Sequence, residues 1–164
     1  MVPLTLVLAL STAPPAAAAP APSAQQLAAD VRAESAKILG GAAPADVSGA
    51  LTHLLDVLMT AAQDPGVPEA VRAKLRAARK AAVPGRPLDE AAIRPLRDAY
   101  AALNDGTPFA VSDDLDGMEA LSAYGRRLAA AAAEALDRNE RAQATRNLLE
   151  FVLFVVTPME VPPA

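Results

Sequence analysis

The chain contains one histidine, His53, and no cysteine, so few kinds of reactive site can be built from its side chains. One histidine holds a zinc ion only if several carboxylates join it, and the metalloprotease pattern H-E-x-x-H is absent. No arrangement of serine, histidine and acid predicts a catalytic triad. Without cysteine, disulfides, iron–sulfur clusters, covalently attached haem and thiol catalysis are excluded. We therefore expect a non-enzymatic protein.

A methionine offers one way to complete a site around His53. Non-covalent haem b is held by one histidine and one methionine in some four-helix bundles, and Met59, Met118 and Met159 are the candidates for the second ligand. The ordinary interpretation is that His53 lies at the margin of an apolar stripe and that the methionines fill the core. A periplasmic haem-b electron carrier is thus the alternative function, and the main one needs no cofactor.

An acidic loop from Ser112 to Gly117 has part of the pattern of a calcium-binding loop. If Gly117 takes the sixth position, Asp114 and Asp116 take the third and the fifth. Serine then stands first and alanine twelfth, so two of the strongest ligands are missing. We expect Asp113, Asp114 and Asp116 to accept hydrogen bonds at the start of a helix, without a metal.

Four cations of one predicted helix could bind a partner. Arg72, Arg76, Arg79 and Lys80 share a face that suits an anion, a lipid headgroup or an acidic protein, although a solvated face is the ordinary interpretation. The net charge of −4 and the lack of aromatic residues among these cations argue against nucleic acid as the partner.

The segment from Leu148 to Val156 is apolar almost all round and contains Phe151 and Phe154. It is too short to cross a membrane, and a helix of this kind normally lies at the centre of its bundle. If one side of the segment stays exposed, Phe151 and Phe154 would bind a partner, a second copy of the chain or an apolar ligand.

Helical spacing of apolar residues, interrupted by Gly and Pro, runs through the chain after residue 22. No window has the alternation of a strand. Ser23 and Gln26 predict a capping box, Gly40 and Gly41 predict a helix end, and Pro95 should kink or delay its helix. The predicted helices are Ser23 to Gly40, Asp46 or Ser48 to Ala62, Pro68 to Val83, Asp89 to Leu103, and one or two between Asp113 or Asp116 and residue 157.

The choice between one and two final helices rests on two conflicting signals. Asp137 and Glu140 have the spacing of a capping box, whereas a seven-residue apolar spacing continues from Leu128 to Val156. The sequence as a whole predicts an all-α, up-and-down bundle of four to six helices with a helix-rich C-terminal half.

The first 22 residues predict an export signal. An apolar run from Val2 to Leu10 is followed by small residues, and Ala16 and Ala18 fit the positions before a cleavage site between residues 18 and 19, although no Lys or Arg precedes the apolar run. Residues 19–22 would then be a short linker, 23–157 the domain and 158–164 a Pro-rich tail.

The amino-acid composition indicates the source of the protein and its relation to membranes. Abundant Ala, and Arg in excess over Lys, are typical of a GC-rich bacterial genome, and nothing in the mature chain predicts a transmembrane segment. We expect a periplasmic or extracellular helical bundle, monomeric or oligomeric, that acts structurally or by binding a protein partner or an apolar or anionic ligand.

Overall fold

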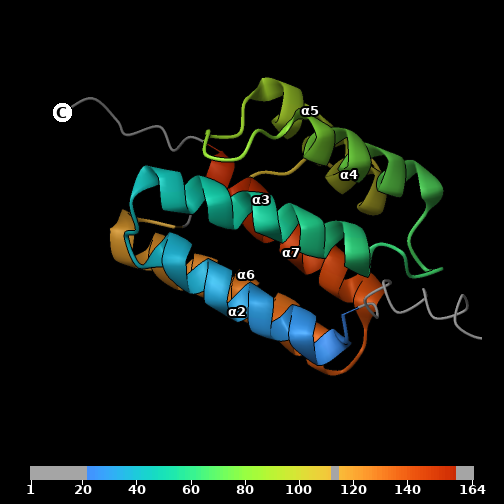
Figure 1. Cartoon of the computed structure of the whole chain (residues 1–164), viewed down its shortest axis with the longest axis horizontal. Coiled ribbons are helices and arrows are strands. Elements are labelled where there is room, and N and C mark those ends of the chain that lie inside the picture. The colour runs from blue at the N-terminus through green and yellow to red at the C-terminus, as the bar shows by residue number, and fades with distance from the viewer. Residues whose placement is uncertain (1–21, 112–114, 158–164) are drawn as a thin grey trace, which may run out of the picture.

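The computed structural model describes residues 22–111 and 115–157, and within these ranges it is helical, without strands. This confirms the predicted all-α bundle with a helix-rich C-terminal half. The expected signal peptide at 1–18, the linker up to residue 21 and the tail at 158–164 lie outside the described residues. The helices are α2 (Ala24–Leu39), α3 (Pro44–Ala61), α4 (Glu69–Ala81), α5 (Glu90–Leu103), α6 (Gly117–Asp137) and α7 (Arg141–Val156) (Figure 1).

Several helix ends follow the signals in the sequence. Ser23 Oγ accepts from the backbone N–H of Gln26, whose side chain accepts in return from the N–H of Ser23, so the predicted capping box is present. Helix α2 ends before Gly41, which has a φ of +79°. Helix α3 begins earlier than predicted because Pro44, with its fixed φ, starts the helix. Helix α5 continues through Pro95.

Two helices, not one, fill the end of the chain. Asn139 adopts a φ of +57°, and its N–H donates to the carbonyl of Leu136 at 2.9 Å. The N–H of Glu140 donates to the carbonyl of Ala135 at 2.8 Å, which completes a Schellman motif. The predicted capping box does not form, because Asp137 is the last residue of α6 and the Glu140 side chain makes no capping bond.

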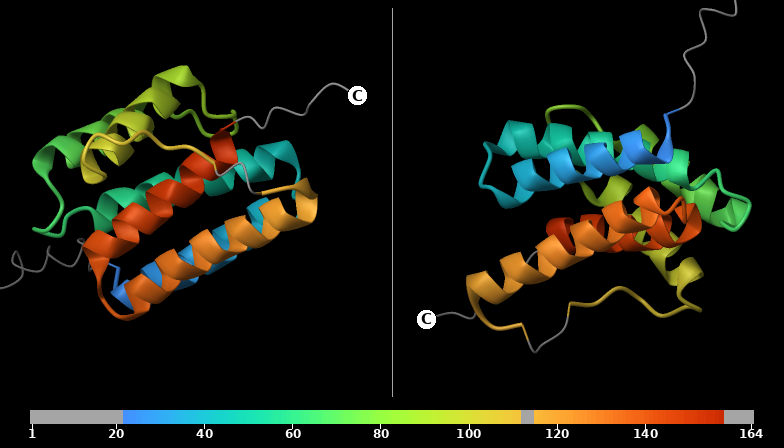
Figure 2. Two further views of the ribbon diagram at one scale, coloured as in Figure 1. Left: turned by 180° about the vertical axis from the view of Figure 1, so that it is seen from behind. Right: turned by 90° about the horizontal axis from the view of Figure 1, so that it is seen from below.

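Helices α2, α3, α7 and α6 form a four-helix ring in which neighbouring helices are antiparallel, and α4 and α5 form a hairpin outside it (Figures 1 and 2). Helix α4 packs against α3, and α5 packs against α7. Because α5 and α6 point the same way, the chain returns along the bundle between Leu103 and Gly117 (Figure 2). The chain direction therefore alternates from α2 to α5 and again from α6 to α7, and the predicted up-and-down order is interrupted between α5 and α6.

Helix α7 lies at the centre, as its all-round apolar pattern predicts, because α3, α5 and α6 all pack against it. Gly125 lets α6 approach closely: a Cβ atom there would stand 3.0 Å from a ring carbon of Phe154 and 3.1 Å from a methyl of Leu39. None of the helices in the described ranges is long and apolar enough to cross a membrane. The α7 residues with no exposed surface are Leu148, Leu149, Phe151, Val152 and Leu153.

Candidate functional site

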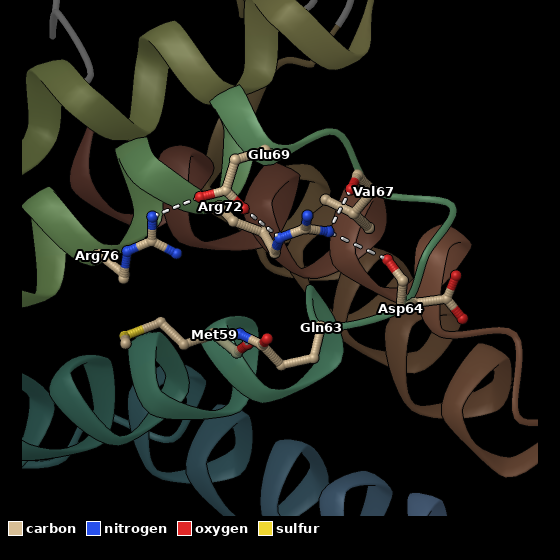
Figure 3. Close-up of polar contacts among 7 residues, drawn as sticks. All are labelled: Met59, Gln63, Asp64, Val67, Glu69, Arg72 and Arg76. Atoms are coloured by element: carbon tan, nitrogen blue, oxygen red, sulfur yellow. Dashed lines mark hydrogen bonds and ion pairs between the residues drawn. The ribbon is translucent and has the colours of Figure 1, made fainter.

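The basic face of α4 is engaged in contacts within the protein. Arg72 donates to Glu69 Oε2 at 2.8 Å and to the carbonyl of Val67 at 2.6 Å (Figure 3). Arg76 donates to Glu69 Oε1 at 2.7 Å. These hydrogen bonds, from Arg76 first and then Arg72, lower the pKa of Glu69. Two of the predicted partner-binding cations therefore bind the start of their own helix and the turn before it.

A third cation of this face joins two helices. Arg79 Nε donates to Asp56 Oδ1 of α3 at 2.7 Å, while Lys80 is exposed. Beside them, Lys74 pairs with Asp98 of α5 at 3.4 Å. Of the four predicted cations, Arg79 thus attaches α4 to α3, while Arg72 and Arg76 bind within α4 and the turn before it. These ion pairs leave less positive potential for a partner than the sequence alone predicts.

The residues considered for haem lie apart. His53 is 46% exposed and faces Asp30 and Glu34 of α2. Met59 follows it on the same helix but lies on the side of α4, near Arg76 (Figure 3). Met118, in the first turn of α6, is 79% exposed, and Met159 lies outside the described ranges. Among the described residues, His53 is thus not paired with Met59 or Met118 on opposite sides of one iron, and these side chains do not form a haem b site.

Of the three carboxylates in the acidic loop, the structure describes one, that of Asp116. Asp113 and Asp114 fall outside the described part of the chain. Asp116 occupies the N-cap position of α6, as expected, but its side chain accepts no capping hydrogen bond. Across residues 22–111 and 115–157, no group of three or more His, Asp or Glu side chains is placed to hold a metal ion.

Phe151 and Phe154 belong to the core, so the exposed side that a partner surface on this segment would need is not present at these two residues. Phe151 has no exposed area, and Phe154 is 8% exposed. The ring of Tyr124 meets Phe154 edge-on, with centroids 5.1 Å apart. Since α7 is covered by three other helices, neither side chain is available for docking.

A groove of about 430 Å³ runs between α2 and α6, and we call it the α2–α6 groove. Arg32 of α2 and Arg126 of α6 stand on it, with alanines and Leu39 between them. Arg32 hydrogen-bonds Asp137, and this bond raises the pKa of Arg32 and lowers that of Asp137. The lining residues are Arg32, Ser35, Ala36, Leu39, Gly40, Arg126, Ala129 and Ala130.

A second groove, of about 470 Å³, lies between α2 and α3, and we call it the α2–α3 groove. His53 stands at one side, with its Nε2 at 3.6 Å from Asp30 Oδ2 and its Nδ1 at 3.7 Å from Glu34 Oε1. Lys37 Nζ lies 3.0 Å from the same Glu34 oxygen. The lining residues are Glu34, Lys37, Ala42, Ala45, Asp46, Gly49, Ala50 and His53.

No local sequence pattern indicates either groove. The spacing of Asp30, Glu34 and Lys37 places all three on one face of a helix, which was the only available signal. His53 belongs to α3, and it joins Asp30 and Glu34 only because α3 packs against α2. Comparison of the chain with known protein families, with curated proteins and with solved structures gives no match. The two grooves are therefore the features of the described residues that bear on function.

Proposed function

We propose that this protein is an exported, non-catalytic helical bundle that binds an anionic ligand with an apolar chain in the α2–α6 groove. The observation that carries the proposal is the exposed guanidinium group of Arg126 beside an apolar floor, with Arg32, which hydrogen-bonds Asp137, on the facing helix. A guanidinium group binds a carboxylate or a phosphate through two parallel hydrogen bonds.

The floor of the groove suits an alkyl chain. Ala36 of α2 and Ala129 and Ala130 of α6 have short side chains, so a slender apolar body can lie between the two helices. Burying apolar surface contributes roughly 25 cal/mol for each Å² removed from water. The volume of about 430 Å³ is in the range of small-ligand sites. An acyl chain ending in a carboxylate combines both features.

Two observations support binding without catalysis. Ser35 is the one hydroxyl side chain among the residues that line the groove, and its Oγ donates to the carbonyl of Arg32 at 3.2 Å. No histidine or carboxylate lines this groove to act as its general base. Export is supported by the leader pattern in residues 1–18.

Calorimetric titration of the secreted protein with decanoate, below its micelle concentration, tests the ligand class. We expect saturable binding that Arg126→Glu weakens at least tenfold, because the substitution places a negative charge beside the carboxylate. Arg94→Glu, at an exposed position of α5, is the control and should bind like the parent protein. Equal affinity for decyltrimethylammonium, or no saturable binding of decanoate, would contradict the proposal.

N-terminal sequencing tests the export component separately. The protein recovered from the periplasm or the medium of the host should begin at Ala19. Recovery of a chain that begins at Met1 from the cytoplasm would show that the first 18 residues are not a cleaved signal.

A further inference from the structure

We propose that the α2–α3 groove is a second binding site, on the other side of α2, and that it takes an organic cation: a primary ammonium or guanidinium group. The inference is independent of the proposed function, since the two grooves share no lining residue and carry opposite charges.

A buried carboxylate, that of Glu34, lines this open groove. The side chain of Glu34 is 9% exposed, whereas that of Lys37, its nearest cationic partner, is 56% exposed. A buried carboxylate needs a charged or hydrogen-bonding partner to offset the loss of water. Because Lys37 is long and mostly in solvent, it can turn away while a ligand cation takes its place on Glu34 Oε1.

Carboxylates outnumber cationic side chains in and beside the α2–α3 groove. Glu34 and Asp46 line the groove, and Asp30 adjoins it through His53. Three carboxylates thus face one lysine and one histidine, which gives a potential that attracts cations. The described residues do not bring three ligands together for a metal ion. An organic cation needs no such coordination shell, so its chemistry matches the separated carboxylates better.

Small residues of α3 leave room for a ligand in the α2–α3 groove. Gly49 is exposed within α3, and a Cβ atom built on it would meet nothing within 4 Å. Ala45 and Ala50 beside it are also small, so the groove stays open along α3 next to the carboxylates. Glycine is unfavourable inside a helix, and its presence here preserves room that alanine or a larger residue would reduce.

His53 provides the reporter for the test, because one histidine gives one set of imidazole signals in an NMR spectrum. We would titrate the full chain with agmatine, which carries both a primary ammonium and a guanidinium group. The expected result is a saturable shift of the His53 signals. A shift that sodium chloride reproduces at the same ionic strength, or no saturable shift, overturns the proposal.

Two variants locate the binding. Glu34→Gln removes the buried negative charge with little change in shape and should weaken agmatine binding at least tenfold. Gly49→Leu should block the groove without changing a charge, and circular dichroism should show an unchanged helix content. Glu119→Gln, exposed on α6, is the control and should bind like the parent protein. Unchanged agmatine binding in both groove variants would overturn the assignment.

A short peptide with one arginine distinguishes the two sources of the same cation. Tighter binding of the peptide than of agmatine assigns the groove to a basic side chain of a protein partner, and the reverse order assigns it to a free amine. The decanoate titration reports on the other groove, so failure of one proposal is distinguishable from failure of the other.

Discussion

At the scale of single residues, Glu150 is the one carboxyl group of the core helix α7, and its pKa is shifted. It is the one charged residue between Leu148 and Val156, and burial raises its pKa, although Arg146 acts in the opposite direction. Burial and then the charge of Glu150 raise the pKa values of Tyr100 and Tyr124, and Arg127 lies over the Tyr124 ring. The folded state therefore favours the neutral form of Glu150.

This predicts a pH-dependent effect of Glu150→Gln. Because the folded-state pKa is raised, the stability that the neutral carboxyl group provides is fully present below the unfolded-state pKa, about 4.3, and is lost as the pH rises through the folded-state pKa. Glutamine keeps the neutral form at every pH. Thermal unfolding should show a melting temperature higher than that of the parent at pH 7, and the difference should fall towards zero near about pH 3.5.

Glu119→Gln is the control, since Glu119 is exposed, and it should show no such gain at pH 7. A melting temperature of Glu150→Gln below that of the parent at pH 7 would mean that the attraction between Glu150 and Arg146 outweighs the cost of burial.

Contacts were predictable from the sequence where both residues lie within one helical turn. The Ser23–Gln26 capping box depends on residues that the helix itself brings together, and so does the cap of α5 by Asp89. The contact between Glu34 and His53 joins different helices, so no local pattern specifies it. For the same reason the two grooves could not be found from the sequence.

At the scale of the elements, the break between α6 and α7 shows why the sequence left two possibilities open. The seven-residue apolar spacing continues because both helices face the same core, and the break comes from the backbone of Asn139. Asparagine is one of the few residues that adopts a positive φ at low cost. The tendency of one asparagine to adopt a positive φ is too weak to predict a helix end where the apolar spacing continues across it.

The burial of α7 was predictable, since a helix that is apolar on every side has no side suited to water. We expect Val152→Asp to prevent folding, because an unpaired carboxylate would replace a side chain with no exposed area. The cost is several kcal/mol, comparable with a total stability of about 5–15 kcal/mol. Circular dichroism and thermal unfolding measure the outcome.

Gln143→Asp is the matched control, at an exposed position in the first turn of the same helix, where a negative charge is favourable. It should fold with an unchanged or slightly higher melting temperature. A folded Val152→Asp variant with normal helix content would mean that this side of α7 is open to solvent.

At the scale of the whole molecule, the all-α class and a range of four to six helices were predictable, whereas the choice of neighbouring helices was not. Alanine-rich stripes pack against one another in many combinations, so periodicity alone does not choose which helices touch. In the structure α2 packs against α6. Leu39 lies next to Gly125, which has no side chain to displace it, and Arg32 donates a hydrogen bond to Asp137. A simple up-and-down ring of α2, α3, α6 and α7 would place α6 diagonally across from α2.

Cross-linking distinguishes these two arrangements, and the absence of cysteine makes the experiment clean. Arg32→Cys with Asp137→Cys replaces an exposed ion pair, which should cost little stability. A short bismaleimide should join the two thiols within one chain under native conditions, and mass spectrometry detects the product. The pair Arg94→Cys with Asp137→Cys is the control and should not cross-link, because α5 packs against α4 and α7. If the first pair failed to react within the folded chain, α2 would not adjoin α6, and the proposed groove between them would be lost.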